Sequence, residues 1–115
     1  MMNVMDIDGV KAVIRFDPEI GLFRGEFVGL NGGADFYAAD VDGLRREGAE
    51  SLRVFLEACQ EDEAEPFKAY SGKFVLRLPP EYHRAAAIAA QAEGLSLNQW
   101  VAMAIRAAVE NGEHA

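Results

Sequence analysis

The sequence predicts an α+β protein made of two small domains, residues 1–70 and 71–115. Three observations support this fold class. Short alternating runs rich in β-branched residues fill the first 40 positions, a pattern typical of strands. From residue 41 onward, apolar residues recur at helical spacing. After residue 72 an alternating hexapeptide precedes two further helical segments, and 115 residues leave room for two very small domains.

The first domain is expected to begin with a small meander of strands followed by one helix. The expected strands are residues 10–17, 22–29 and 34–38. Pro18 and Gly21 supply turn chemistry between the first two strands, and the Asn-Gly-Gly at 31–33 supplies the next turn. The first two strands should therefore form a hairpin.

One long helix is expected after these strands. Asp40 is a suitable N-cap residue, and Asp42 lies in the first turn, where the helix dipole favours an anion. Gly43 and Gly48 each cost on the order of 1 kcal/mol relative to alanine, so the first half of this helix should depend on packing. The apolar stripe consists of Val41, Leu44, Leu52, Phe55, Leu56 and Cys59.

The net charge of -8 is concentrated in the first domain. Residues 1–70 hold 15 acidic and 7 basic side chains, whereas residues 71–115 hold 4 of each. An acidic domain beside a cationic strand indicates two partners of opposite charge, although a merely solvated acidic surface would give the same composition. Residues 67–71, after the acidic stretch 60–65, are either a short strand of the first domain or the linker to the second.

The hexapeptide Lys73–Leu78 has two different faces when it is extended, because side chains alternate along a strand. The apolar face carries Phe74, Leu76 and Leu78, and the other face carries Lys73, Val75 and Arg77. Pro79 and Pro80 end the strand, since neither can donate to a ladder. Pro80 also suits the first position of an alanine-rich helix that reaches Glu93.

A second helix is predicted after Gly94, which is a C-terminal cap signal. Ser96 and Gln99 match a capping box at its start. The apolar stripe of this helix consists of Trp100, Val101, Ala104, Ile105 and Ala108. A strand and two helices in about 40 residues seldom fold alone, and the strand has no partner within the domain. We therefore expect a homodimer, or a higher oligomer with an even number of chains, in which two copies of the strand pair in antiparallel. The dimer core is expected to consist of Phe74, Leu76, Leu78, Trp100 and Ile105.

The stretch GKFVLRLPPEYHRAAAIAAQAEGLSLNQWVAMAI resembles a ribbon-helix-helix DNA-binding domain of the Arc/MetJ class, over residues 72–110. The resemblance implies that Lys73, Val75 and Arg77 read bases in the major groove of operator DNA. It also implies that backbone amides near Ser96, Leu97 and Asn98 hold a phosphate. Arginine and lysine can contact guanine O6 and N7. Without the two helices, Lys73 and Arg77 would simply be a charged outer strand face, and Ser96 is expected to cap its helix in either case.

Three further segments resemble the HicB antitoxin family, namely FDPEIGLFRGEFVGL, DFYAADVDGLRREGAESLRVFLEAC and EPFKAYSGKFVLRLPPE, so that the likeness covers residues 10–110. It implies a partial RNase H-like fold for the first domain. It further implies a type II toxin–antitoxin system, in which the acidic domain neutralises HicA, a small basic ribonuclease that cleaves mRNA. The second domain would repress its own operon.

An enzyme is not expected, and neither is a metal or other cofactor. The carboxylates available for a two-metal nuclease fit turns and outward strand positions equally well; they are Asp6, Asp8, Asp17, Glu19 and Glu26. His83 has no partner at metal-ligand spacing. The remaining alternatives are a ribbon-helix-helix repressor whose first domain senses a small molecule or metal, and a degenerate or active nuclease.

A cytoplasmic protein is expected. The start of the chain has no basic region followed by an apolar core, as a secretory signal would have. No window approaches the roughly 18 uninterrupted apolar residues that read as a membrane span, so no membrane partner is expected either.

Overall fold

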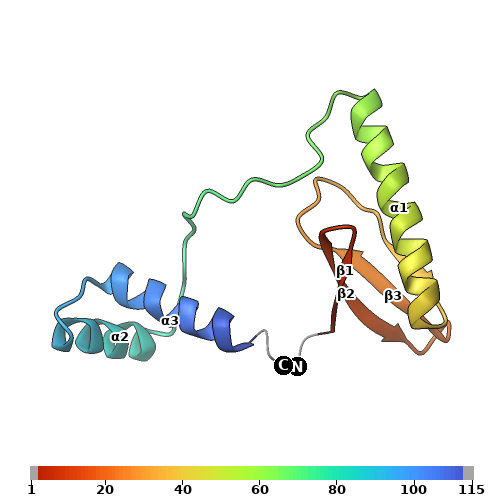
Figure 1. Cartoon of the computed structure of the whole chain (residues 1–115). Helices are drawn as coiled ribbons and strands as arrows, with labels where there is room; N and C mark the ends of the chain where they lie inside the picture. The colour runs from red at the N-terminus through yellow and green to blue at the C-terminus, as the bar shows by residue number, and fades with distance from the viewer. Residues whose placement is uncertain (1–2, 113–115) are drawn as a thin grey trace. The chain divides into compact units, whose positions relative to one another are not determined.

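The computed structural model describes residues 3–112 and divides the chain into two compact units, Asn3–Tyr70 and the residues from Ser71 onward. Residues 1–2 and 113–115, at the ends of the two expected domains, lie outside the described residues. The first unit contains β1 (Val4–Ile7), β2 (Val10–Asp17), β3 (Leu22–Phe27), β4 (Phe36–Ala38) and α1 (Val41–Glu61). The second contains α2 (Pro80–Ala92) and α3 (Leu97–Gly112), as Figure 1 shows. The fold class is therefore α+β, and no helix within residues 3–112 is long and apolar enough to cross a membrane.

The sheet is an antiparallel meander with the strand order β1-β2-β3-β4. The β1–β2 hairpin was not expected from the sequence. Ile7 pairs with Val10, so Asp8 and Gly9 form a two-residue loop, and both have positive φ, 49° and 88°. Such a loop matches the right-handed twist of the flanking strands, and Asp-Gly is a strong signal for it. The side chain of Asp6 accepts a hydrogen bond from the Gly9 amide at 2.8 Å and so stabilises the turn.

The β2–β3 hairpin confirms the expected turn. Gly21 has φ 68° and its amide donates to the carbonyl of Asp17 at 2.9 Å. β3 ends at Phe27 rather than at Gly29, because Gly29 takes φ 91° and turns the chain away. β4 is also shorter than expected and begins at Phe36. The partial RNase H-like assignment stays a prediction.

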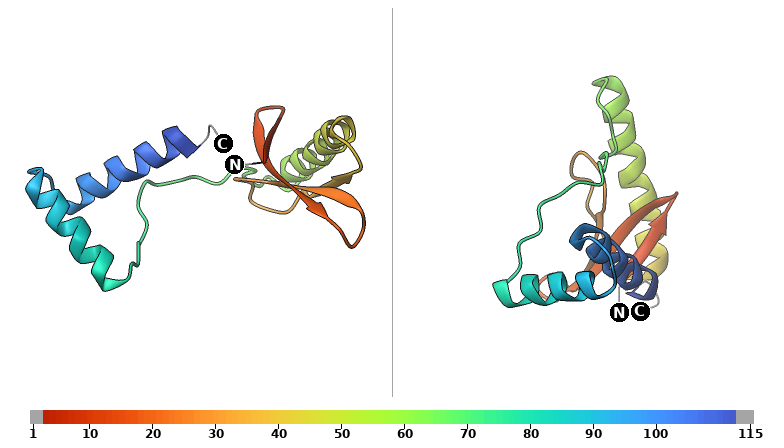
Figure 2. Two further views of the ribbon diagram at one scale, coloured as in Figure 1. Left: turned by 90° about the horizontal axis from the view of Figure 1, so that it is seen from below. Right: turned by 90° about the vertical axis from the view of Figure 1, so that its left-hand side faces the viewer.

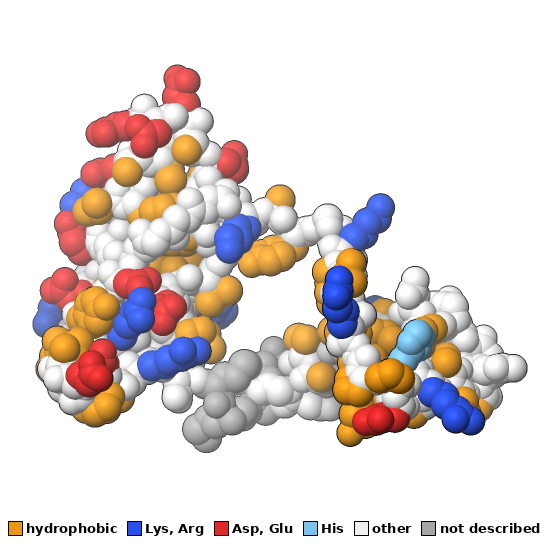
Figure 3. Space-filling view, turned by 180° about the vertical axis from the view of Figure 1, so that it is seen from behind, with side chains coloured by type: hydrophobic (Ala, Val, Ile, Leu, Met, Phe, Trp, Pro, Cys, Tyr) orange, Lys and Arg blue, Asp and Glu red, His pale blue; other side chains and the backbone are white. Residues whose placement is uncertain are grey.

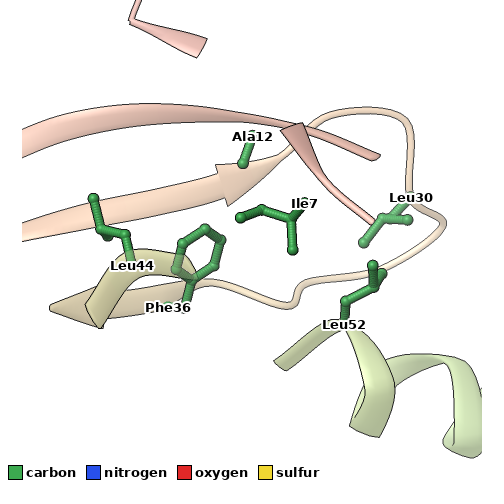
Figure 4. Packing of buried hydrophobic residues seen from close by; sticks show 6 residues of the cluster. All are labelled: Ile7, Ala12, Leu30, Phe36, Leu44 and Leu52. Atoms are coloured by element: carbon green, nitrogen blue, oxygen red, sulfur yellow. The ribbon is translucent and has the colours of Figure 1, made fainter. Parts of the chain in front are cut away.

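The hydrophobic core lies between α1 and one face of the sheet, as Figure 4 shows. Its buried members come from β1, β2, the loop after β3, β4 and α1; they are Ile7, Ala12, Leu30, Phe36, Leu44 and Leu52. The helix begins as expected: the side chain of Asp40 accepts a hydrogen bond from the Gly43 amide at 2.6 Å. The first unit thus has a core of its own.

Gly43 and Gly48 have low helix propensity, which alone would destabilise α1, but the structure shows that both allow close packing against the sheet. Both are buried where the helix meets the sheet. A Cβ on Gly48 would lie 3.0 Å from Cε2 of Phe36, and one on Gly43 would lie 2.9 Å from Cβ of Ala38. The absence of side chains therefore allows close packing, which offsets the propensity cost.

Asn31 forms hydrogen bonds that hold the segment after α1 against the loop that follows β3. Its amide donates to the carbonyl of Pro66 at 2.9 Å, and its side-chain nitrogen donates to the carbonyls of Glu65 and Phe67 at 2.9 and 3.1 Å. Phe67 also forms a single antiparallel bridge with Leu30. Of the two alternatives for residues 67–71, the first two residues therefore pair with the first unit, while residues 69–71 have no regular structure.

The second unit consists of α2 and α3, which lie against each other after a short turn, as Figure 2 shows. Pro80 occupies the first position of α2, and Gly94 has φ 73° just beyond its end, as expected. The capping box is fully formed: the Gln99 amide donates to the Ser96 hydroxyl at 3.1 Å, and the Ser96 amide donates to Oε1 of Gln99 at 2.8 Å.

Candidate nucleic-acid interface

Residues Lys73–Leu78, called the arm below, precede α2 and are exposed at every position. The expected strand is not formed within the described chain, where the arm has no ladder partner. A strand needs the backbone of a neighbour to satisfy its N–H and C=O groups. The paired ribbon therefore stays a prediction that requires a second chain.

The apolar face of the arm is turned toward the helices. Phe74, Leu76 and Leu78 line a hollow of about 580 Å³. Gly72, just before the arm, and the arm residue Lys73 also line it, together with His83 and Ala86 of α2 and Leu97, Asn98, Val101, Ala102 and Ile105 of α3. Val75 does not line this hollow and is 82% exposed. Val75 therefore differs from the three apolar residues of the arm, whereas Lys73, predicted to share the face of Val75, lines the hollow with them. The division of the arm into two faces stays a prediction.

The second unit lacks a core of its own. Only two of its described residues are buried, Ala86 and Ala90. Phe74 is 73% exposed, Trp100 is half-buried and Ile105 is 42% exposed. Further exposed apolar side chains are Tyr82, Ile88, Met103 and Val109. Apolar exposure on this scale in about 40 residues marks an interaction surface.

The start of α3 offers two free backbone donors. The amide of Ser96 is occupied by the side chain of Gln99. The amides of Leu97 and Asn98 lie in the first turn, where a helix provides no acceptor for them. The dipole of α3 also favours an anion at this position. Of the three amides implicated by the sequence, those of Leu97 and Asn98 are therefore the ones left available for a phosphate.

The cations of the arm are not engaged elsewhere. Within residues 3–112, Lys73 and Arg77 take part in no ion pair. In the first unit, by contrast, Arg53 bridges Glu50 and Glu57 along α1, and the Arg53 guanidinium lowers the pKa of the Glu50 carboxyl. Figure 3 shows further carboxylates gathered over the end of α1.

Two of the carboxylates considered for a nuclease, Asp6 and Asp17, are held by local contacts. Asp6 bonds to Lys11 and to the Gly9 amide, and a side-chain oxygen of Asp17 accepts from the Glu19 amide at 3.0 Å. No group of three or more His, Cys, Asp or Glu residues in the described part of the chain could hold a metal ion. Cys59 is buried on the core-facing side of α1, as its helical position predicted.

Comparison with known families gives one finding, a match of residues 55–105 to the HicB family. The matched stretch runs from the second half of α1 through the arm and α2 into α3. Over this stretch, which is less than half of the chain, the sequence is similar to the HicB family. No curated protein and no solved structure matches the chain.

Proposed function

We propose that this chain is the antitoxin of a type II toxin–antitoxin system. Its first unit would bind and neutralise a HicA-type mRNA-cleaving toxin, and its second unit would pair with a second copy to repress its own operon. The observation that carries the proposal is the arm: a two-faced segment with free cations, joined to a helix pair that has no core of its own. The HicB match covers the arm, α2 and α3 as far as Ile105, and supports an antitoxin role at the level of the family.

The DNA-binding half of the proposal follows from pairing two arms in antiparallel. Their apolar faces would close over four helices, and each fully buried side chain such as Phe74 or Leu76 would contribute roughly 1.5–3 kcal/mol. Lys73, Val75 and Arg77 of both chains would then point away from the helices. A two-stranded ribbon fits the major groove, where arginine and lysine discriminate guanine and Val75 offers an apolar contact to a thymine methyl.

The phosphate contacts would lie at the start of α3. The amides of Leu97 and Asn98 have no intrahelical partner, and a helix N-terminus binds anions through such amides. Contacts of this kind fix register and orientation on the duplex without reading sequence. Base readout would then rest on the arm alone.

The toxin-binding half rests on charge. The excess negative charge of the chain belongs to residues 1–70, and an RNA-cleaving partner must carry a basic surface for its own substrate. Complementary potentials speed association and fix orientation. The first unit also has a core of its own, so it can present a fixed surface to a protein.

The proposal is tested by co-expressing the chain with the product of the neighbouring gene. The wild-type chain should relieve growth arrest, co-purify with that product and shift DNA from its own promoter. Arg77→Ala should lose promoter binding and keep neutralisation, whereas the control Arg106→Ala, late in α3, should keep both. A chain that binds the promoter but not the neighbouring product would favour the alternative, a repressor with a ligand-sensing first domain.

A further inference from the structure

The apolar layer between α1 and the sheet is open at one end. Phe16 lies on the face of β2 that α1 covers, in alternation with the buried Ala12, yet its side chain is 55% exposed. Val41 continues the core-facing stripe of α1 that contains Leu44, three residues further on, yet it is also 55% exposed. Both β2 and α1 therefore extend beyond the buried core that lies between them.

These exposed side chains lie at the same end of the first unit. Phe16 pairs with Phe23 across β2 and β3, with the two rings edge to face and their centroids 5.4 Å apart. Phe23 in turn pairs with Ala38 of β4, and Ala38 lies against Gly43 in the first turn of α1. Figure 1 shows the β2–β3 turn and the start of α1 at one end of the unit. This surface, called the open end below, consists of Phe16, Ile20, Phe23 and Val41.

Carboxylates predominate at the open end, although Arg46 of α1 reaches its first turn, where Nη2 lies 3.7 Å from the position that a Cβ on Gly43 would take. The segments that form it, residues 16–23 and 38–44, contain no lysine or arginine. They contain four carboxylates, those of Asp17, Glu19, Asp40 and Asp42. Ile20, at the turn between two of them, is 52% exposed. An apolar surface with a predominantly negative edge fits a protein surface that carries an apolar side chain among basic ones.

Val54 provides an internal comparison. It is 52% exposed on the same helix, but it lies on the solvent-facing side, where a single exposed valine is ordinary. Val41 differs because it lies on the side of α1 that faces the sheet, at the end of the apolar layer between them. Exposure alone therefore does not distinguish the two valines, whereas their positions relative to the core do.

We infer that the open end is the surface through which the first unit binds its basic protein partner, which inserts an apolar side chain beside Phe16 and Val41. The inference rests on the proposed function and specifies which surface serves it. The acidic stretch at the other end of α1 then contributes to long-range attraction rather than to the contact itself.

The test compares identical substitutions at the two valines in the full-length chain. Val41→Lys removes an apolar group and adds a charge that repels a basic partner, so the dissociation constant for the co-expressed toxin should rise about ten-fold or more. Val54→Lys should change it by less than about three-fold. Phe16→Ser is the second variant, and thermal unfolding of each protein alone checks that the first unit remains folded.

The possible results separate the two proposals. Toxin binding by the wild-type chain that Val41→Lys and Phe16→Ser leave unchanged would overturn the open end as the binding surface, and so would a greater loss at Val54. A changed oligomeric state of the Val41→Lys chain alone, measured by light scattering, would assign the open end to a second copy and overturn the inference as well. Failure of the wild-type chain to bind toxin would instead overturn the proposed function, and with it the assignment of the open end as the toxin-binding surface.

Discussion

The phenyl ring of Phe36 lies directly over the α-carbon of Gly25, its partner on the neighbouring strand. Gly25 is buried, and a side chain there would occupy the space that the ring now fills. The ring therefore occupies the space over Gly25, where it also packs against Phe27 with the ring centroids 5.1 Å apart. The central aromatic residue of the first unit thus depends on a glycine in a strand, a position where glycine is otherwise unfavourable.

Gly25→Ala should lower the free energy of unfolding of the first unit by about 1–3 kcal/mol, because the added methyl overpacks the core. Chemical denaturation followed by far-ultraviolet circular dichroism measures this change. Gly33→Ala is the matched control, since a Cβ at Gly33 meets nothing within 4 Å. Equal effects at the two glycines would contradict the packing role of Gly25.

Leu76→Ser and Val75→Ser should have opposite consequences, although the two residues are neighbours in the arm. The first removes a side chain from the hollow between the arm and the helices and should weaken homodimerisation at least ten-fold, measured by analytical ultracentrifugation. The second alters the other face and should leave the dimer intact while lowering promoter affinity. Loss of the dimer in both variants would show that the two faces are not distinct.

Ser96→Ala should destabilise the second unit by about 1 kcal/mol, because the Gln99 amide loses its capping acceptor. The measurement is thermal unfolding at fixed protein concentration. Ser96→Asp keeps an acceptor at the cap and should retain most of the stability. A loss in the aspartate variant equal to that in the alanine variant would rule out capping as the cause.

The carboxyl of Asp6 should titrate below its usual range, since the side chain of Lys11 and then the Gly9 amide lower its pKa. A lowered pKa in the folded chain means that the contribution of Asp6 to stability is present above the unfolded pKa and is lost as the pH falls through the folded one. Carbon-detected NMR titration should show this pKa returning upward in Lys11→Met. Lys68→Met is the control and should leave it unchanged.

Asn31→Ala should loosen the segment after α1 while the rest of the first unit stays folded. The substitution removes two hydrogen bonds to backbone carbonyls, at Glu65 and Phe67, so the nearby amide of Lys68 should exchange with solvent several-fold faster. Hydrogen exchange by NMR measures this rate, with the Gly21 amide as an internal reference. An unchanged rate at Lys68 would show that the backbone contacts suffice.

Much of the first unit could be predicted from local sequence. The β2–β3 hairpin and the start of α1 follow from Gly21 and Asp40, whose effects act within a few residues. β1 was missed because it is only four residues long, although Asp8-Gly9 carried the signal for its hairpin. The side-chain hydrogen bonds of Asn31 join residues 34 and 36 positions apart, and no local sequence pattern predicts them.

The same distinction applies to the candidate interfaces. The two faces of the arm could be proposed from local sequence because alternation is a property of an extended strand, and they stay a prediction. The open end could not be predicted from local sequence. The pattern places Phe16 and Val41 at core-facing positions, and their exposure depends on where β2 ends and α1 begins. The dependence of Gly48 on packing was predicted, but its partner Phe36 was not, since that residue lies in another element.

The first unit has a hydrophobic core of its own and the second unit does not, and this contrast has a consequence for how the two activities depend on protein concentration. Under the proposed function, a single chain can already capture toxin, whereas an operator-reading ribbon requires two chains to meet. At low abundance, the amount of dimer varies with the square of the chain concentration, while toxin capture varies with its first power. Repression should therefore fade before neutralisation does as the protein is diluted, and a cell that is losing its antitoxin would resume synthesis while some protection remains.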